Sequence, residues 1–364
     1  MSLNIGIVGL PNVGKSTLFN ALIRSRTAAV APYPFCTIDP NVGVVEVPDE
    51  RLKRIAEIAK PEKITPTTIQ FKDIAGLIKG ASKGEGLGNQ FLSHIRESDA
   101  IIQIVRFFKD ELVPHVHETV DSKRDKEIIN TELILADLQT LEKRLEKART
   151  DTRSAKPEAK KYLELLEKIQ AGLSEETLVR EMKLAEEEEE KIRDLHFITQ
   201  KPVIYIANVS ESELKNMKKE DLRSALGLSN DAAVIPICAK IEEELSSLNP
   251  QEAKEYLAQL GVEDTGLNEV IKASYSALGL ITYFTQGPKE VRAWTVRSGV
   301  TAPQAAGVIH TDFEKHFIKA EVIAYDDFIS SGGEVPAREK GLMRVEGKDY
   351  VVRDGDIIFF RVNA

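Results

Sequence analysis

The chain has 364 residues, of which 42% are hydrophobic and 29% charged, as in an ordinary globular protein. Its length predicts roughly two or three domains, and its formal net charge of −9 argues against a surface built mainly to contact nucleic-acid phosphates. Its two cysteines, Cys36 and Cys238, exclude a disulfide framework and fit a reducing compartment. No signal-peptide pattern and no apolar run of about 20 residues occurs. We therefore expect a cytoplasmic protein without a membrane partner.

A phosphate-binding pattern lies near the N-terminus. Residues 9–17 read GLPNVGKST and match G-x-x-x-x-G-K-[ST] at every fixed position. The short apolar run 3–8 before them predicts a buried parallel strand, and apolar residues at helical spacing in 17–23 predict a helix after them. A glycine loop between a strand and a helix brings backbone N–H groups and the helix N-terminus against phosphate oxygens.

We predict that this loop binds the phosphates of a nucleotide. Lys15 would neutralise charge on the β- and γ-phosphates, and the Ser16 hydroxyl would be a ligand of Mg²⁺. The expected nucleotide-binding residues of the loop are Asn12, Val13, Gly14, Lys15, Ser16 and Thr17.

Two later segments are expected to complete the phosphate site. The proline-rich loop 31–41 contains Thr37, and in P-loop nucleotide hydrolases a threonine at this place completes the Mg²⁺ shell and senses the γ-phosphate. Residues 67–76 predict a strand that ends in Asp73, with Gly76 three residues further on. Asp73 would hold the hydration shell of Mg²⁺, and the Gly76 N–H would meet the γ-phosphate.

The remaining patterns predict a helical insertion and a separate C-terminal module. Apolar residues step by four and three along 134–148 and return along 162–169, which predicts an antiparallel helical coiled-coil hairpin. After residue 280, strand-like runs and a short helix predict a small α+β module with no visible nucleophile or metal cluster, so we expect it to bind a partner. The expected domains are a nucleotide-binding domain at 1–125 and 200–279, the helical insertion at 126–199 and the C-terminal module at 280–364.

The predicted base-reading loop favours ATP over GTP. GTPases commonly read guanine with Asn-Lys-x-Asp, and this chain has Asn208, Val209 and Glu211 at the three fixed places. Glutamate is one methylene too long for the bidentate contact of aspartate with guanine, and each hydrogen bond to a charged group is worth about 1.5–3 kcal/mol. One feature favours GTP instead: residues 238–240, Cys-Ala-Lys, resemble the Ser-Ala-Lys loop whose backbone N–H receives guanine O6.

Taken together, these motifs resemble those of the YchF / Obg-like ATPase family. The similarity is carried by the phosphate loop and by PFCTI at 34–38, DIAGL at 73–77, GEGLGNQFL at 84–92 and NVSE at 208–211. KEVRAWT at 289–295 and APQAAGVIHTDFE at 302–314 are similar to the TGS domain of that family. The resemblance covers essentially the whole chain.

The resemblance implies both a fold and an activity. The fold is an α/β P-loop nucleotide hydrolase with a mainly parallel sheet, an inserted antiparallel coiled-coil hairpin and a small α+β TGS domain of the ubiquitin-like kind. The family lacks the water-orienting glutamine, as Leu77 shows here, and the resemblance assigns that work to His115, with His117 close enough to leave the choice open. Asn12 matches an asparagine that helps to ligate K⁺ in potassium-dependent relatives, which makes K⁺ a candidate cofactor beside Mg²⁺.

We therefore expect a slow Mg²⁺-dependent hydrolysis of the β–γ bond of ATP by in-line attack of water, in a switch that associates with the ribosome. Ser16, Thr37 and Asp73 would surround the metal, and Lys15 would stabilise charge on the phosphates. Ribosomal subunits, including their RNA, are the expected partners, and sequence-specific DNA is not. A GTPase in ribosome assembly or translation and an ATP-binding scaffold with incidental hydrolysis are the alternatives. Redox control through Cys36 is left open.

Overall fold

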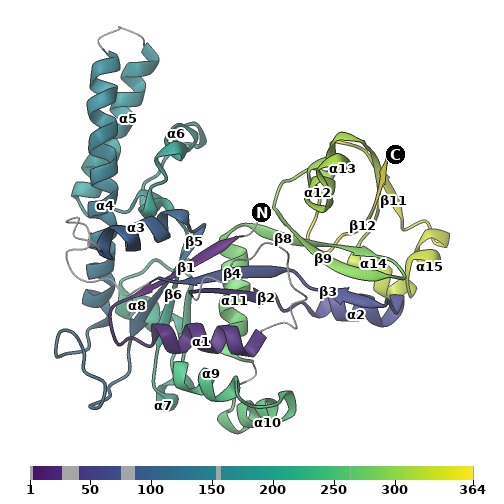
Figure 1. The fold of residues 1–364 in the computed structure, drawn as a ribbon, viewed down its shortest axis with the longest axis horizontal. Coiled ribbons are helices and arrows are strands. Elements are labelled where there is room, and N and C mark those ends of the chain that lie inside the picture. The colour runs from purple at the N-terminus through teal and green to yellow at the C-terminus, as the bar shows by residue number, and fades with distance from the viewer. Residues whose placement is uncertain (1–2, 27–40, 75–86, 153–156, 263, 364) are drawn as a thin grey trace.

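The molecule is built on two sheets with a long helical hairpin beside the first of them (Figure 1). A computed structural model of the chain describes residues 3–26, 41–74, 87–152, 157–262 and 264–363. In these parts of the chain each sheet has six strands, and helices lie on both faces of the first. The predicted α/β fold class with a mainly parallel sheet is thereby confirmed.

The first sheet is mainly parallel because its short apolar strands are joined by helical crossovers. Its strand order is β2-β4-β1-β5-β6-β7, and within it β2 alone runs antiparallel to its neighbour. Its strands are β1 (Asn4–Gly9), β2 (Val42–Glu46), β4 (Thr68–Asp73), β5 (Ala100–Arg106), β6 (Val203–Asn208) and β7 (Val234–Ile237). The parallel strands end at one common edge, where the loops that carry the predicted site residues begin.

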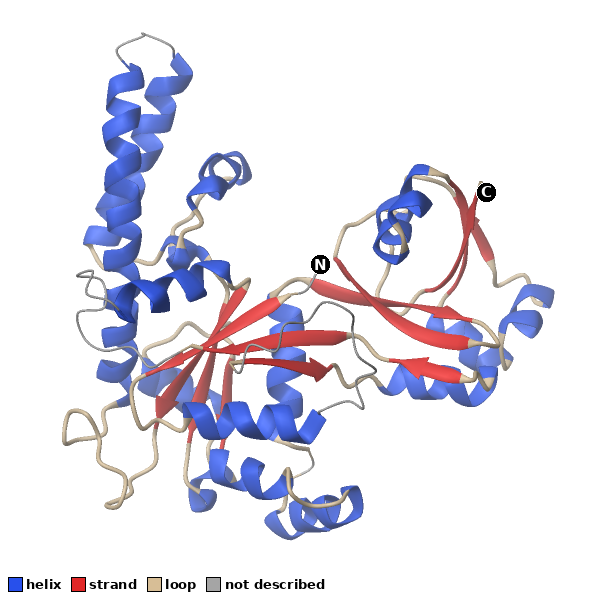
Figure 2. Cartoon of the chain, viewed as in Figure 1, coloured by secondary structure: helices blue, strands red, loops and turns tan. Residues whose placement is uncertain are grey.

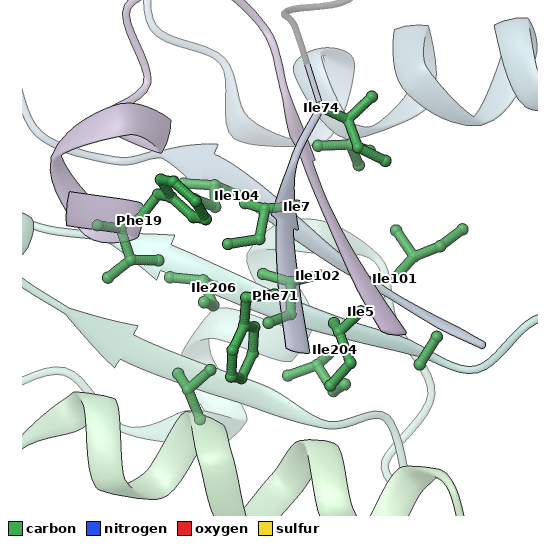
Figure 3. Close-up of a cluster of buried hydrophobic side chains, with 14 of the residues drawn as sticks. Ile5, Ile7, Phe19, Phe71, Ile74, Ile101, Ile102, Ile104, Ile204 and Ile206 are labelled. Carbon is green, nitrogen blue, oxygen red and sulfur yellow. The ribbon is translucent and has the colours of Figure 1, made fainter. Parts of the chain in front are cut away.

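Helices cover this sheet and enclose an apolar core. Apart from the hairpin, the helices of this half of the molecule are α1 (Lys15–Arg26), α3 (Leu87–Glu97), α7 (Glu211–Leu214), α8 (Lys219–Leu226), α9 (Ala239–Leu245), α10 (Pro250–Leu260) and α11 (Gly266–Ala277), of which α10 packs on α9. Figure 3 shows Phe19 of α1 and Phe71 of β4 among isoleucines from the central strands. This packing holds β1 and α1 against each other, and so places the phosphate loop that joins them. None of the described helices is both long and apolar enough to cross a membrane.

A helical hairpin is inserted in the chain between β5 and β6 and projects away from both sheets (Figure 2). It consists of α4 (Ser122–Asp151) and α5 (Pro157–Ser174), followed by α6 (Glu186–Ile192) and 3-10 helices at Val179–Glu181, Arg193–Leu195 and Ile198–Gln200. The predicted apolar seam is buried, with Leu141 and Leu145 in one cluster with Leu166. At its base the buried Asp137 accepts hydrogen bonds from the backbone N–H groups of Ile198 and Thr199, which anchors the hairpin beside β6.

The second sheet belongs mostly to the C-terminal residues. Its order is β11-β10-β12-β8-β9-β3, with helices packed on it. The strands are β3 (Lys63–Thr65), β8 (Leu280–Gln286), β9 (Glu290–Arg297), β10 (Phe317–Ile323), β11 (Arg344–Glu346) and β12 (Ile357–Val362). The helices are α2 (Glu50–Ala59), α12 (Ala302–Ile309), α13 (Thr311–Lys315), α14 (Tyr325–Ser331) and α15 (Glu334–Glu339).

Two elements of the second sheet's layer come from the N-terminal half of the chain. β3 pairs in parallel with β9, and α2 places Leu52 and Ile55 in the same buried cluster as Phe284. The sequence analysis kept residues 50–65 in the nucleotide-binding domain, because a three-residue strand with a distant partner has no periodic signal of its own. The expected domain limits remain a prediction, but the segment between β2 and β4 physically joins the two sheets.

Candidate functional site

A cavity of about 1210 Å³ opens at the carboxyl edge of the first sheet. The loop after β1, the end of β4 and the loops after β5, β6 and β7 surround it. Parallel α/β sheets bind ligands at this edge, because loops from neighbouring strands meet there. The predicted site residues that line the cavity are Asn12, Gly14, Lys15, Ser16, Thr17, Asp73, Asn208, Val209 and Glu211. Val13 lies behind them and is buried.

The phosphate loop turns tightly between β1 and α1. Asn12 and Gly14 have positive φ angles of 62° and 92°, while Val13 between them does not. Alternating backbone conformations of this kind turn successive N–H groups toward one concave point, where an anion binds. A Cβ on Gly14 would lie 2.3 Å from Nδ2 of Asn208, so the close approach of these two residues requires glycine.

Lys15, Ser16 and Asp73 meet on the phosphate side of the cavity. The Lys15 ammonium forms an ion pair with Asp73 in which both side chains are mostly shielded from solvent. The Ser16 hydroxyl lies 3.5 Å from the other carboxylate oxygen of Asp73. A hydroxyl and a carboxylate are ligands suited to Mg²⁺, which typically binds one or two protein oxygens together with phosphates and water. Within the described residues, no group of three or more His, Cys, Asp or Glu side chains is arranged to hold a metal ion by itself. Ser16 and Asp73 therefore fit a metal that takes its remaining ligands from the nucleotide and water.

Part of the predicted phosphate site lies outside the described residues. This applies to Thr37 and Gly76, and equally to Cys36 and Leu77. Their predicted roles remain predictions.

Asn208 is a structural bridge at the base-reading loop. Its side chain is buried, its Nδ2 donates to the Val13 carbonyl at 2.8 Å, and its Oδ1 accepts from the Ala239 N–H at 3.0 Å. Both ends of the amide are therefore engaged within the protein, and they join the loop after β6 to the phosphate loop and to the start of α9. Asn208 thereby shapes the cavity, and its predicted contact with the nucleotide stays a prediction.

The opposite end of the cavity carries the residues predicted to distinguish bases. Glu211 begins α7 and is exposed, and Lys240 of α9 lines the same wall. The Ser210 side chain donates to Glu213 at 2.6 Å, which holds the start of α7 in place. Cys238 is buried, and this burial raises the pKa of its thiol, so it behaves as a small apolar side chain. A carboxylate and an ammonium group thus remain available where the base would lie.

The histidine expected to position water is held outside the cavity lining. The side chain of His115 is 3% exposed, and its Nε2 lies 2.7 Å from the Asp125 carboxylate. Its Nδ1 accepts a hydrogen bond from the His117 backbone N–H at 3.1 Å, which leaves the proton on Nε2 to be donated to Asp125. Another histidine, His94 of α3, does line the cavity and was not singled out from the sequence. The assignment of His115 stays a prediction, and in this conformation both of its ring nitrogens are occupied.

The sequence analysis also missed Arg106, the last residue of β5. Its side chain is fully buried and donates to backbone carbonyls of the phosphate loop and of the loop after β5. A charged residue at the end of a mostly apolar strand, directly before the cavity loops, is the signal that could have found it. Phe108 and Lys109, which follow it, line the cavity.

Two family models match separate parts of the chain. A model described as 50S ribosome-binding GTPase matches residues 4–149. The model YchF-GTPase_C, whose description is "Protein of unknown function", matches residues 280–363. These ranges include, respectively, the phosphate loop and most of the second sheet.

Curated relatives and a solved structure match from end to end. The Ribosome-binding ATPase YchF of Bacillus subtilis is 50% identical over 367 aligned residues, with all of both chains covered. The Ribosome-binding ATPase YchF of Haemophilus influenzae is 53% identical over 364 residues, again with full coverage. The structure of the Schizosaccharomyces pombe YchF GTPase is 42% identical, has a TM-score of 0.89 and covers 99% of this chain and 98% of its own.

Proposed function

This chain belongs to the YchF family, and from that premise we propose that it is a Mg²⁺-dependent ATPase that hydrolyses ATP to ADP and phosphate and acts as a nucleotide switch on the ribosome. The observation that carries the proposal is the meeting of Lys15, Ser16 and Asp73 in a cavity bounded by the phosphate loop. A carboxylate, a hydroxyl and an ammonium group in this arrangement suit a metal-bound triphosphate better than any uncharged ligand.

The contacts of Lys15 suggest how the site receives a nucleotide. Its ammonium is paired with Asp73, and a bound triphosphate would offer it a second anionic partner. Movement of the ammonium to the β- and γ-phosphates would leave Asp73 and Ser16 to hold the metal shell together with Thr37. When bound, Mg²⁺ neutralises the charge that develops on the phosphates. The Gly76 N–H would meet the γ-phosphate, so that its loss releases the segment after β4.

Glu211 supports ATP as the preferred nucleotide. It occupies the place where GTPases commonly carry aspartate, and it lines the base end of the cavity. The bacterial relatives are named ATPases, in agreement with this preference, whereas the yeast relative is named a GTPase. GTP is therefore the alternative substrate.

The ribosome is the proposed partner because the curated relatives are named ribosome-binding and one family model is described in the same terms. The helical hairpin and the second sheet are parts that a minimal nucleotide-binding domain does not have, and we propose that one of them contacts the ribosome.

For the chemical step we propose that His115 positions the attacking water and that K⁺ binds beside Asn12 as a second cation. Equal hydrolysis rates in Na⁺ and K⁺ buffers would remove K⁺ from the proposal.

The test is steady-state phosphate release from Mg·ATP and Mg·GTP in K⁺ buffer, with and without ribosomes. We expect a higher kcat/KM for ATP and stimulation by ribosomes. A higher kcat/KM for GTP would make the protein a GTPase. A stable Mg·ATP complex that releases no phosphate even with ribosomes present would instead support a nucleotide-binding scaffold.

A further inference from the structure

Two side chains at the ends of neighbouring strands hold consecutive carbonyl groups of the phosphate loop. Arg106 and Asn208 are register partners, the last residues of β5 and β6. Arg106 donates through Nη1 to the Asn12 carbonyl at 3.3 Å, and Asn208 donates through Nδ2 to the Val13 carbonyl at 2.8 Å. The two contacts come from one rung of the sheet, so they are placed by the same strand pairing.

These contacts determine where the N–H groups of the loop point. A trans peptide is planar, with its C=O and N–H directed to opposite sides. A hydrogen bond that draws the Asn12 carbonyl toward Arg106 therefore turns the Val13 N–H the other way. The bond from Asn208 does the same for the N–H of Gly14. Carbonyls held against the sheet leave the N–H groups facing the cavity, where phosphate oxygens would accept from them.

The guanidinium of Arg106 also holds a second wall of the cavity. Its Nε donates to the Phe108 carbonyl at 3.1 Å, and its Nη2 donates to the carbonyls of Asp110 and Val113 at 3.3 and 2.9 Å. It lies over the Phe108 ring, 4.2 Å from the ring centroid. One planar side chain thus binds four carbonyls from two loops, and both loops line the cavity.

The positive charge of Arg106 has no carboxylate partner within the described residues. Arg106 is 1% exposed. Within the described residues, carbonyl dipoles and the Phe108 ring balance the charge in place of a carboxylate, at a desolvation cost. Phosphate oxygens bound on the other side of the phosphate loop would balance the positive charge of Arg106. The buried guanidinium should therefore strengthen the binding of a polyphosphate.

We propose that Arg106 is a positioning residue for the nucleotide. Its planar guanidinium group orients the phosphate-binding N–H groups and holds the loop 107–113 against the phosphate loop. The inference rests on the proposed nucleotide-binding function. Lysine keeps the charge at this position but cannot bind four carbonyls, whereas glutamine keeps planar N–H donors without the charge.

The test compares Arg106→Lys, Arg106→Gln and a matched control, Arg180→Lys. Arg180 also donates to a backbone carbonyl, that of Thr199 at 3.3 Å, but it does not line the cavity. We measure the Kd for Mg·ADP by calorimetry and amide hydrogen exchange with the folded proteins. Both Arg106 variants should weaken binding about tenfold or more. Exchange should be faster in 12–14 and 107–113, while the control keeps the affinity and the exchange of the wild type.

A merely structural Arg106 would lower the free energy of unfolding without changing the affinity of the folded protein for Mg·ADP, and this result would overturn the proposal. Wild-type affinity in Arg106→Lys alone would show that charge acts without positioning, which also overturns it. Phosphate release by the wild type is measured separately. Its absence would refute the proposed ATPase, whereas the Mg·ADP affinities would still decide the role of Arg106.

Discussion

The side-chain amide of Asn208 lies 2.8 Å from the carbonyl oxygen of Val13, so the loop expected to read the base is hydrogen-bonded directly to the loop expected to bind phosphates. The same amide accepts from the N–H of Ala239 at the start of α9. A change at this one side chain should therefore affect the phosphate end of the site as well as the base end.

Asn208→Ala should weaken Mg·ADP binding and destabilise the fold together. The substitution leaves a buried carbonyl and a buried N–H without partners, which typically costs about 1–3 kcal/mol for each group. We expect the Kd measured by calorimetry to rise about tenfold and the free energy of unfolding in urea to fall. Asn208→Asp is the matched variant, since it keeps the acceptor for Ala239 but places an acceptor opposite the Val13 carbonyl. An unchanged Kd in both variants would show that the bridge does not shape the phosphate loop.

Glu211→Asp should move nucleotide preference toward GTP. The shorter side chain restores the carboxylate reach that guanine recognition commonly uses, and we expect the ratio of kcat/KM for GTP to ATP to rise about tenfold. Steady-state phosphate release with each nucleotide measures this ratio. Glu220→Asp on the exposed face of α8 is the control and should leave it unchanged. If the ratio stays constant in Glu211→Asp, base selection lies elsewhere in the cavity.

His115→Ala should lower kcat while the Kd for nucleotide stays unchanged, if this side chain leaves Asp125 to position water. It should also reduce the free energy of unfolding by about 1–3 kcal/mol, since it removes a hydrogen bond between buried groups. His117→Ala, measured in parallel, tells the two candidates apart. A loss of stability with full kcat in His115→Ala would make its contact with Asp125 purely structural.

Glu242 should make stability depend on pH. Its side chain is 5% exposed, and burial raises its pKa from 4.5 to about 7, although one oxygen accepts from the Gly266 N–H at 2.7 Å. A carboxyl with a raised pKa holds its proton more tightly in the folded state. Its contribution to stability is thus fully present below pH 4.5 and is lost as the pH rises through 7.

The Glu242→Gln variant removes this contribution and keeps an acceptor for Gly266. Relative to the wild type, its free energy of unfolding should therefore rise between pH 5 and pH 8 by up to about 3 kcal/mol. Urea denaturation at several pH values measures the difference. Glu57→Gln on the exposed surface of α2 is the control. Parallel pH profiles for Glu242→Gln and the wild type would show that Glu242 does not titrate in this range.

Removal of residues 280–364 should unfold part of the nucleotide-binding half. α2 buries Leu52 and Ile55 against Phe284, and Arg51 pairs with Asp354 at 2.6 Å. Without these partners, amide exchange in 50–65 should approach that of an unfolded segment, measured by mass spectrometry. Exchange of β5 in the first sheet serves as the internal control. Full protection of 50–65 in the truncated chain would show that this segment folds without the second sheet.

The sequence by itself determined the phosphate loop with the strand before it and the helix after it, the strand that ends in Asp73, and the helical hairpin. Each of these is specified by nearby residues. The phosphate loop has a glycine where φ is positive and a lysine and a serine at the start of the next helix, and the hairpin has apolar residues at a regular helical spacing. That is why the tight turn at GLPNVGKST and the apolar seam along 134–148 could be predicted, and why the family resemblance could be stated before any contact was known.

Only the tertiary structure decided what depends on distant partners. The short strand β3 exists only because it pairs with β9, far away in the sequence. Arg106 contacts Asn12 only because β5 lies between β1 and β6 in a particular register. The pairing of His115 with Asp125 likewise depends on how α4 approaches the loop before it. Strand order and register are set by the packing of the whole core, which no local period encodes.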